Sequence, residues 1–255
     1  MKQPKLELLS PAGSWEALEA AVRSGADAVY LGGSLFSARA NAQNFDHDTL
    51  KQAVAYCHAR GVKVHLAVNT ILLNHEIEPA LDFVAFACTL PVDAVIVQDT
   101  GLLHLLRQAA PTLQIHASTQ MSVHTPEGAK LLAEQGVPRV VLARELSLKE
   151  IKEISRALKD GGFAHVEIEH FVHGALCMSV SGQCYFSSLL GSRSGNRGQC
   201  AQTCRLPFSA KGGTGYDLSL KDLSMIERIG ELADAGVTSF KIEGRMKRPE
   251  YVAAA

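Results

Sequence analysis

Short apolar runs recur along the chain, and each is followed by a segment whose apolar residues have helical spacing. This alternation predicts parallel strands joined by crossover helices. The runs are continuous in Val, Ile and Leu rather than alternating with polar residues, which indicates strands that are buried on both faces. Eight runs of this kind are present, at residues 6–10, 28–31, 63–68, 94–98, 114–117, 139–143, 165–171 and 239–243.

Eight strand–helix units in 255 residues predict a (β/α)8 TIM-like parallel barrel, a fold of typically about 250 residues. An open doubly wound sheet is the alternative, but the segment Pro-Ala-Gly-Ser at residues 11–14 is not a glycine-rich dinucleotide fingerprint. We therefore expect a single barrel domain over residues 1–255. The segment Pro-Glu-Tyr at residues 249–251 resembles the first turn of an eighth helix, and we expect that final helix to be truncated.

Composition excludes several classes of protein. The net charge is −1, so the chain as a whole is not built to attract nucleic acid or a membrane surface. No apolar run reaches about 18 residues, so no membrane-spanning helix is expected. The first residues lack the apolar stretch of a signal peptide, which predicts a cytoplasmic protein.

Polar residues gather near the ends of several predicted strands. In barrels of this class the active site lies at the carboxyl ends of the strands. We therefore expect a polar pocket at that mouth of the barrel. Its predicted members are Glu7, Arg39, Asn69, His116, Gln120, Arg144, Glu169, His173, Glu243 and Arg245.

A long insertion over residues 172–216 interrupts the pattern after the seventh strand, and a loop of this length inside a domain is usually functional. It carries four cysteines with the spacing C-x6-C-x15-C-x3-C. In a reducing compartment such cysteines indicate a metal or catalytic role rather than disulfides. The four are Cys177, Cys184, Cys200 and Cys204. The remaining two, Cys57 and Cys88, lie in helical segments and are expected to be buried apolar residues.

Spacing alone leaves the kind of metal centre open. Four thiolates suit zinc or an iron–sulfur cluster. Structural zinc sites favour pairs separated by two to four residues, a habit that only Cys200 and Cys204 follow. Unliganded or redox-active thiols are the third alternative. The segment from residue 170 to 216 has no Asp or Glu but carries Arg193, Arg197, Arg205 and Lys211, a setting that favours an anionic cluster or substrate.

Two stretches of the insertion resemble a known family. Residues 169–177 (EHFVHGALC) and 181–187 (SGQCYFS) are similar to the signature of the collagenase-like peptidase family, class U number 32, with Phe186 as a mild departure. The blocks LELLSPAG at 6–13, HASTQ at 116–120 and FKIEGR at 240–245 also read like family blocks, so the resemblance covers the whole chain. Relatives continue beyond this C-terminus, so a C-terminal part of the family is expected to be absent here.

The resemblance implies oxygen-independent hydroxylation rather than proteolysis. Branches of the family are implicated in hydroxylating a tRNA uridine, a large-subunit rRNA cytidine or ubiquinone precursors, with a [4Fe-4S] cluster on cysteines and, in the RNA branches, prephenate. Residues 195–205 are similar to the RNA branches. The firmly implied cluster ligands are Cys177, Cys184 and Cys200, and the last ligand, Cys204, lies where the family pattern is less uniform. The position after Lys221-Asp222-Leu223, where many relatives have a cysteine, is Ser224.

We assign the residues of the predicted pocket to two roles. Glu169, Glu243, His116 and Arg144 are predicted to be catalytic, and Arg245, Arg39, Asn69, Gln120 and His173 to bind substrate. The implied partners are RNA, a small carboxylate such as prephenate, and the iron–sulfur assembly machinery. RNA phosphates would be held by Arg193, Arg197, Arg205, Lys247 and Arg248. Two alternatives remain: a peptidase, as the family name states, and a non-catalytic cluster-binding partner in quinone hydroxylation.

Overall fold

The computed structural model describes residues 5–210 and 212–255. Within them, eight parallel strands form a closed barrel in the order β1-β2-β3-β4-β5-β6-β7-β11, and β11 pairs with β1 to complete the circle. The (β/α)8 prediction is confirmed. The strands are β1 (Glu7–Pro11), β2 (Ala28–Gly32), β3 (Lys63–Val68), β4 (Ala94–Val97), β5 (Ile115–Ala117), β6 (Arg139–Val141), β7 (Glu167–Gly174) and β11 (Val237–Ile242).

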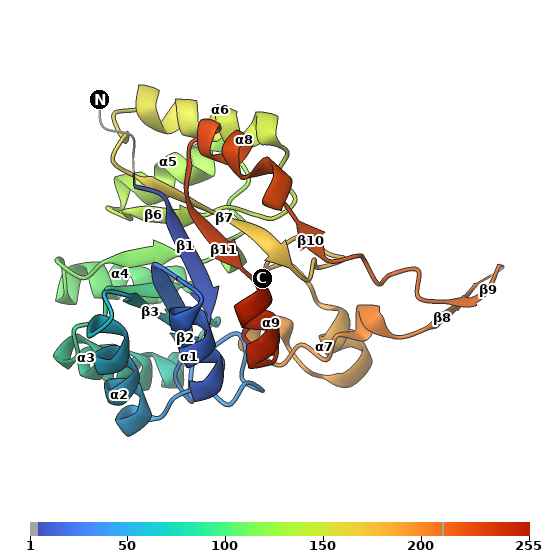
Figure 1. Ribbon diagram of the computed structural model, residues 1–255, viewed down its shortest axis with the longest axis horizontal. Helices are drawn as coiled ribbons and strands as arrows, with labels where there is room; N and C mark the ends of the chain where they lie inside the picture. The colour runs from blue at the N-terminus through green and yellow to red at the C-terminus, as the bar shows by residue number, and fades with distance from the viewer. Residues whose placement is uncertain (1–4, 211) are drawn as a thin grey trace.

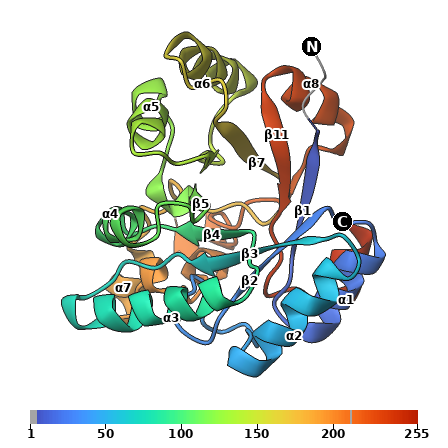
Figure 2. The same cartoon turned by 90° about the vertical axis from the view of Figure 1, so that its left-hand side faces the viewer.

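Helices surround the barrel (Figure 2). Several begin at a side-chain cap that the sequence supplies: Ser14 accepts a hydrogen bond from the Ala17 backbone N–H, and Asp99 accepts one from that of Leu102. No described helix is both long and apolar enough to cross a bilayer. The helices are α1 (Trp15–Arg23), α2 (His47–His58), α3 (Ile77–Thr89), α4 (Thr100–Ala109), α5 (Pro126–Glu134), α6 (Leu148–Asp160), α8 (Ile229–Asp234) and α9 (Pro249–Ala254), with 3-10 turns η1 (Asn74–Glu76), η2 (Thr119–Met121) and η5 (Ile226–Arg228).

The two faces of the barrel wall differ in chemistry. The outer face packs against the helices through one large apolar core. The inner face holds a small apolar cluster of Leu9, Ala28, Tyr30 and Ile96. The rest of the interior includes buried charged and polar side chains, whereas barrels of this class usually fill it with branched apolar residues. These buried residues include Glu7, His65, His116, Arg139, Glu169, Ser239 and Lys241.

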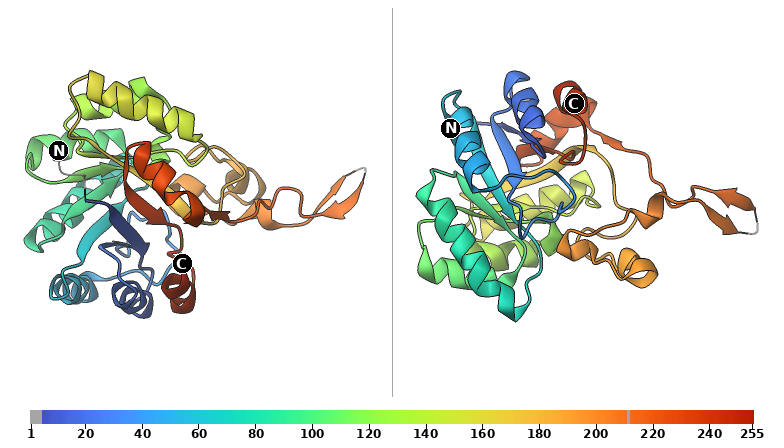
Figure 3. Two further views of the ribbon diagram at one scale, coloured as in Figure 1. Left: turned by 45° about the horizontal axis from the view of Figure 1, so that its top comes forward. Right: turned by 90° about the horizontal axis from the view of Figure 1, so that it is seen from below.

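The cysteine-rich insertion starts later than the sequence suggests, because β7 continues to Gly174 and the first three residues of the predicted range 172–216 belong to the strand. It also extends further, to β10 (Leu223–Ser224), which pairs antiparallel with the end of β7. A hairpin of β8 (Phe208–Ala210) and β9 (Gly213–Gly215) projects away from the barrel in Figures 1 and 3. The other elements are α7 (Phe186–Gly191), η3 (Gly195–Arg197) and η4 (Thr203–Arg205).

Two predictions fail at the level of the fold. Cys57 is buried, as expected, but Cys88 is exposed, because the buried face of α3 is formed by Ala80, Phe83, Val84 and Ala87. Glu7 was expected at the catalytic mouth, but it is the first residue of β1 and therefore lies at the amino end of the barrel.

Candidate active site at the barrel mouth

Glu243, which directly follows β11, organises the mouth of the barrel. Its two carboxylate oxygens accept hydrogen bonds from Arg39 Nη2 at 3.2 Å and from Arg144 Nη2 at 3.1 Å. Burial opposes ionisation of this carboxyl, but Arg39, Arg144 and Arg245 outweigh that effect and lower its pKa to about 2. Glu243 is therefore ionised at neutral pH.

A second arginine system lies beside the first. Arg245 donates to Ser37 Oγ at 2.7 Å, and its guanidinium lies 5.6 Å from the ring centre of Tyr30. The Tyr30 hydroxyl donates to the Ile242 carbonyl at 2.8 Å, which fixes the ring. Burial lowers the pKa of Arg245 to about 10, so the group stays charged at neutral pH.

The cavity at this mouth has a volume of about 30 Å³, which is room for about one water-sized group. Among its lining residues Glu243 is the single acid, against Arg39, Arg144, Arg245 and Lys241. This excess of positive charge favours an anionic group. The lining is completed by Tyr30, Ala38, Ala67, Asn69, Ile96, Ser118, Thr119, Gln120 and Phe171.

Asn69 connects two of the loops that build the mouth. Its Oδ1 accepts from the Ala38 backbone N–H at 3.1 Å, and its Nδ2 donates to Ser118 Oγ at 3.4 Å. Gln120 lies in η2, two residues after Ser118, and also lines the cavity. The loops after β2, β3 and β5 are thus held together by a polar side chain that the sequence had placed there.

Arg144 joins the mouth to the cysteine segment. Besides Glu243, its guanidinium contacts the Ala175 carbonyl at 3.2 Å and Cys177 Sγ at 3.9 Å, and it stacks 4.0 Å above the Phe171 ring centre. The Cys177 thiol has its pKa raised, because surrounding atoms exclude water from part of it, while Arg144 and Arg39 partly offset that rise. The Cys177 thiol and the Glu243 carboxylate at the mouth therefore both contact Arg144.

The surroundings of Cys200 suit anionic sulfur. Cys200 Sγ accepts from the Gln202 backbone N–H at 3.4 Å, and the Ser187 hydroxyl lies 4.0 Å from the same sulfur. Gly195 lies between two of the cysteines, since a Cβ added there would sit 3.7 Å from the Cys184 carbonyl and 3.8 Å from Cys200 Cβ. Hydrogen bonds to sulfur are among the features that tune an iron–sulfur cluster.

The thiols are more widely spread than a zinc ion requires. Tetrahedral zinc with Zn–S bonds of about 2.3 Å holds its sulfurs about 3.8 Å apart. Among the described residues, the one group of three ligand atoms within 4.8 Å of one another is His65, His116 and Glu169, so no three cysteine sulfurs meet that spacing. The insertion thiols are therefore not arranged as a closed tetrahedral zinc site in this structure.

Glycines allow the insertion to dock closely on the mouth loops. Gly182 has φ +78°, and a Cβ there would lie 2.1 Å from the Gln120 carbonyl oxygen. Gly198 has φ +79°, and a Cβ there would lie 2.4 Å from the carbonyl oxygen of Ser37. Both positions therefore require glycine, for conformation as well as for space.

Three predicted site residues lie elsewhere. Glu169 is fully buried inside the barrel, paired with Lys241 at 2.6 Å and Arg139 at 3.3 Å. His116 is also inside the barrel and, like Glu169, is not among the residues that line the mouth cavity. His173 bonds through Nδ1 to the Tyr251 hydroxyl at 3.0 Å, against the last helix. The roles assigned to these residues stay predictions.

Sequence reasoning did not include Lys241 among the site residues and missed Tyr30 altogether. Lys241 belongs to the predicted strand and lies two residues before Glu243, on the same face, so the period of two was a usable signal. Tyr30 lies within an apolar run, and its hydroxyl was the only hint of a polar partner.

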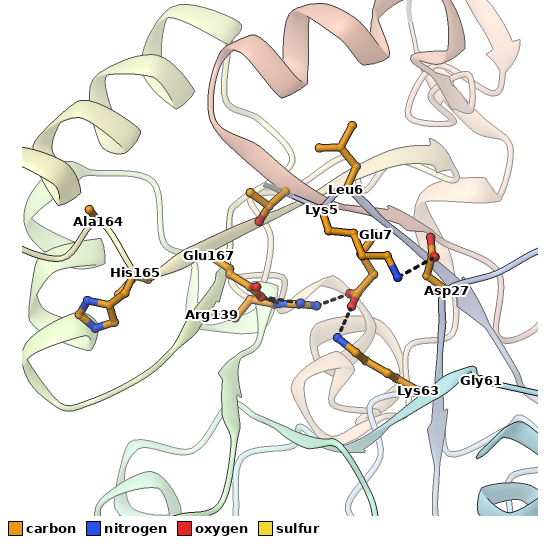
Figure 4. Close-up of a pocket in the computed structure, with 12 residues that line it drawn as sticks. Lys5, Leu6, Glu7, Asp27, Gly61, Lys63, Arg139, Ala164, His165 and Glu167 are labelled. Atoms are coloured by element: carbon orange, nitrogen blue, oxygen red, sulfur yellow. Dashed lines mark hydrogen bonds and ion pairs between the residues drawn. The ribbon is translucent and has the colours of Figure 1, made fainter. Parts of the chain in front are cut away.

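A larger cavity, of about 410 Å³, opens at the opposite, amino end of the barrel (Figure 4). There Glu7 accepts hydrogen bonds from Arg139 and, at 3.4 Å, from Lys63, while Arg139 also pairs with Glu167. Its charges are matched in pairs, and residues at this end of such barrels generally serve stability.

Comparison with known proteins agrees with this architecture. The structure of the U32 peptidase Mk0906 matches with a TM-score of 0.66 at 16% identity, covering 96% of this chain and 95% of the other, which shows the shared fold. The 23S rRNA 5-hydroxycytidine C2501 synthase of Escherichia coli (strain K12) is 45% identical over 97% of this chain and 38% of its own length.

Two further relatives carry different names. The tRNA hydroxylation protein P1 of Bacillus subtilis is 36% identical over 98% of this chain, and a protein of Porphyromonas gingivalis named collagenase is 37% identical over 96%. The chain spans 61% and 62% of their lengths, respectively. The family model described as peptidase family U32 matches residues 13–255. With a relative at 45% identity and a family match over nearly its whole length, the chain belongs to peptidase family U32.

Proposed function

We propose that this chain forms the barrel of an enzyme that hydroxylates a base in tRNA or rRNA without molecular oxygen, in the cytoplasm. Cys177, Cys184, Cys200 and Cys204 hold a [4Fe-4S] cluster in this proposal, supplied by the cell's iron–sulfur assembly machinery. A small carboxylate such as prephenate is the second substrate. The names of the rRNA and tRNA hydroxylation relatives support the reaction class.

The observation that carries the proposal is the position of Arg144. One guanidinium contacts Cys177 Sγ at 3.9 Å and the Glu243 carboxylate at 3.1 Å. A centre on the cysteines would therefore lie next to the cationic mouth. This arrangement supports a centre that takes part in the reaction, because a purely structural metal would need no such connection.

In this scheme the side chains of the mouth bind and orient the substrate. A bound cluster supplies redox or Lewis-acid chemistry. Arg245 and Arg39 offer the planar donor pairs that bind a carboxylate in bidentate fashion. Because the cavity has room for about one water-sized group, no more than the tip of a substrate carboxylate enters it, and the remainder of the substrate lies above the mouth.

Glu243 acts as a positioning residue in this scheme. A carboxylate with a pKa near 2 is a weak base at neutral pH, so it is poorly matched to proton abstraction. It holds Arg39 and Arg144 in place instead. Glu169 is shielded from the mouth and ion-paired, so its predicted acid–base role would require its partner Lys241 to relay the proton.

RNA is expected to contact the exposed cations of the insertion and of the segment after β11. Arg193, Lys221, Lys247 and Arg248 are exposed. Arg197 instead pairs with Glu76 through two bonds of 2.8 and 2.6 Å, and Arg205 bonds to the Leu176 carbonyl at 2.8 Å. Arg197 therefore ties the insertion to η1, whereas Arg205 bonds to a residue of the insertion itself. Lys211, which was predicted only as one of the cations of the acid-free segment, lies outside the described residues.

The test combines a spectrum with an RNA measurement. The protein is purified without oxygen from a strain that expresses it in place of the chromosomal copy. A broad absorbance near 400 nm, together with iron and sulfide, and a hydroxylated base detected by mass spectrometry are expected. Cys177→Ser should lose both, while Cys88→Ser, which alters an exposed cysteine on α3, should retain both. A colourless wild-type protein, or an unchanged RNA profile on deletion, would refute the proposal.

A peptidase is the second candidate, because a relative is named collagenase. A cysteine nucleophile would need a histidine partner. Of the described residues, no histidine hydrogen-bonds to any of the four insertion thiols, and His173, the nearest in sequence, bonds to Tyr251. Cleavage of gelatin by the cluster-free protein, abolished by Cys177→Ser, would favour the peptidase.

A further inference from the structure

The barrel interior contains a cluster of ligand-type side chains that lies outside the lining of the mouth cavity. His65 lies on β3, His116 on β5 and Glu169 on β7. Alternate strands of such a barrel contribute side chains to the same interior layer, so these three residues face one another. One ligand atom from each lies within 4.8 Å of those from the other two.

Both histidines have an unpartnered nitrogen. Nδ1 of His65 and Nδ1 of His116 are buried and have no hydrogen-bond partner among the described residues. His65 is 1% exposed and His116 is 6% exposed, and their ring centres are 4.8 Å apart in an edge-on arrangement. Leaving two such atoms unpaired is costly, and unsatisfied groups of this kind often mark an ion or a water.

The protonation state of the histidines suits metal binding. Burial is the main cause that lowers the pKa of His65, to about 4, and it also lowers the pKa of His116 well below its ordinary value. Both rings are therefore neutral near pH 7, which is the form that binds metals.

Two cations already bond to the carboxylate of this cluster. Glu169 Oε1 accepts from Lys241 at 2.6 Å, and Oε2 accepts from Arg139 at 3.3 Å. Each carboxylate oxygen has a further lone pair, and a ligating carboxylate is normally hydrogen-bonded by neighbouring groups. The charges of Lys241 and Arg139 are balanced by Glu169 and Glu7.

We propose that His65, His116 and Glu169 form a binding site for a divalent transition-metal ion, of the zinc or ferrous class, inside the barrel. Two imidazoles and one carboxylate are a common donor set for both ions. The site contains no cysteine and is therefore independent of the insertion. It goes beyond the proposed RNA function, which does not require it.

The test removes the cysteines first, so that they cannot bind the probe. A chain with Cys177, Cys184, Cys200 and Cys204 replaced by Ser is treated with a chelator and titrated with Co²⁺ and Zn²⁺. One equivalent per chain is expected, with visible cobalt bands that lack thiolate charge transfer. Alkylating the thiols of the wild-type chain provides the same test if the fourfold variant does not fold.

Variants then locate the ion. His65→Gln with His116→Gln, in the same background, should weaken Co²⁺ binding at least a hundredfold, while His75→Gln, at an exposed histidine, should leave it unchanged. Circular dichroism checks that the double variant keeps its fold, and Glu169→Gln supplies an independent loss of affinity. The absence of stoichiometric binding to the cysteine-free chain would overturn the proposal, as would equal affinity in a folded double variant.

Discussion

Replacing Glu243 by Gln tests how strongly the mouth depends on one buried charge. The side chain is 12% exposed, and its pKa of about 2 lies well below the ordinary value of 4.5, because Arg39, Arg144 and Arg245 outweigh the effect of burial. By linkage, this difference corresponds to about 3 kcal/mol of folding stability at pH 7. Gln keeps the shape of the side chain but loses the charge. Glu243→Gln should therefore lower the free energy of unfolding at pH 7 by about 3 kcal/mol.

The sign of the pH dependence follows from the lowered pKa. The stabilisation is complete above the unfolded value of 4.5 and is lost as the pH falls towards about 2. At pH 3 the free energies of unfolding of the wild type and of Glu243→Gln should therefore differ by only about 1 kcal/mol.

The assay is urea unfolding of the metal-free chain in reducing buffer, followed by the fluorescence of Trp15, the single tryptophan. Glu231→Gln is the control, since it breaks an exposed pair with Arg228 and should leave the urea midpoint nearly unchanged. A loss below about 1 kcal/mol at pH 7, or the same loss at pH 7 and pH 3, would refute the electrostatic reasoning.

Three further substitutions examine how the insertion and the last helix are attached. Gly198→Ala should displace the insertion and speed its proteolysis, because the new Cβ meets backbone and φ is positive, whereas Gly212→Ala, with open space around it, should not. Arg197→Ala should also speed cleavage there, since its bidentate pair with Glu76 is lost, and an unchanged digestion pattern would contradict that role. Tyr251→Phe should lower the free energy of unfolding by about 1 kcal/mol in a thermal melt, through the loss of the hydroxyl's bonds to His173 and to the Glu243 carbonyl; an unchanged melting temperature would show that these bonds add nothing.

The fold was readable from the sequence because parallel strands buried on both faces leave continuous apolar runs. The same continuity hides which residues point inward. Glu169 and His116 were expected at the mouth, yet they point into the middle of the barrel, where their phase along the strand depends on register with neighbouring strands. The end of β7 was placed three residues too early for a related reason, since nothing local marks it before Gly174.

Much of the candidate site could also be predicted from the sequence. Arg39, Asn69, Gln120, Arg144, Glu243 and Arg245 all line the mouth cavity, as predicted from their positions just after strands. Their pairing was not readable, because a contact such as Arg39 with Glu243 joins residues that are far apart in the chain. The link between Arg144 and Cys177 likewise depends on how an irregular loop folds back over the barrel.

The pairing of β10 with the end of β7 means that the insertion leaves and rejoins the barrel at a single place. Leu223 lies opposite Gly174 and Ser224 opposite His173, so the two ends of the insertion are already neighbours. Antiparallel neighbours can be joined by a turn of only a few residues, and lengthening such a connection costs little chain entropy. A longer or shorter connection at this point therefore costs the barrel little chain entropy, so the size of the segment 175–222 can change while the eight-stranded frame remains the same.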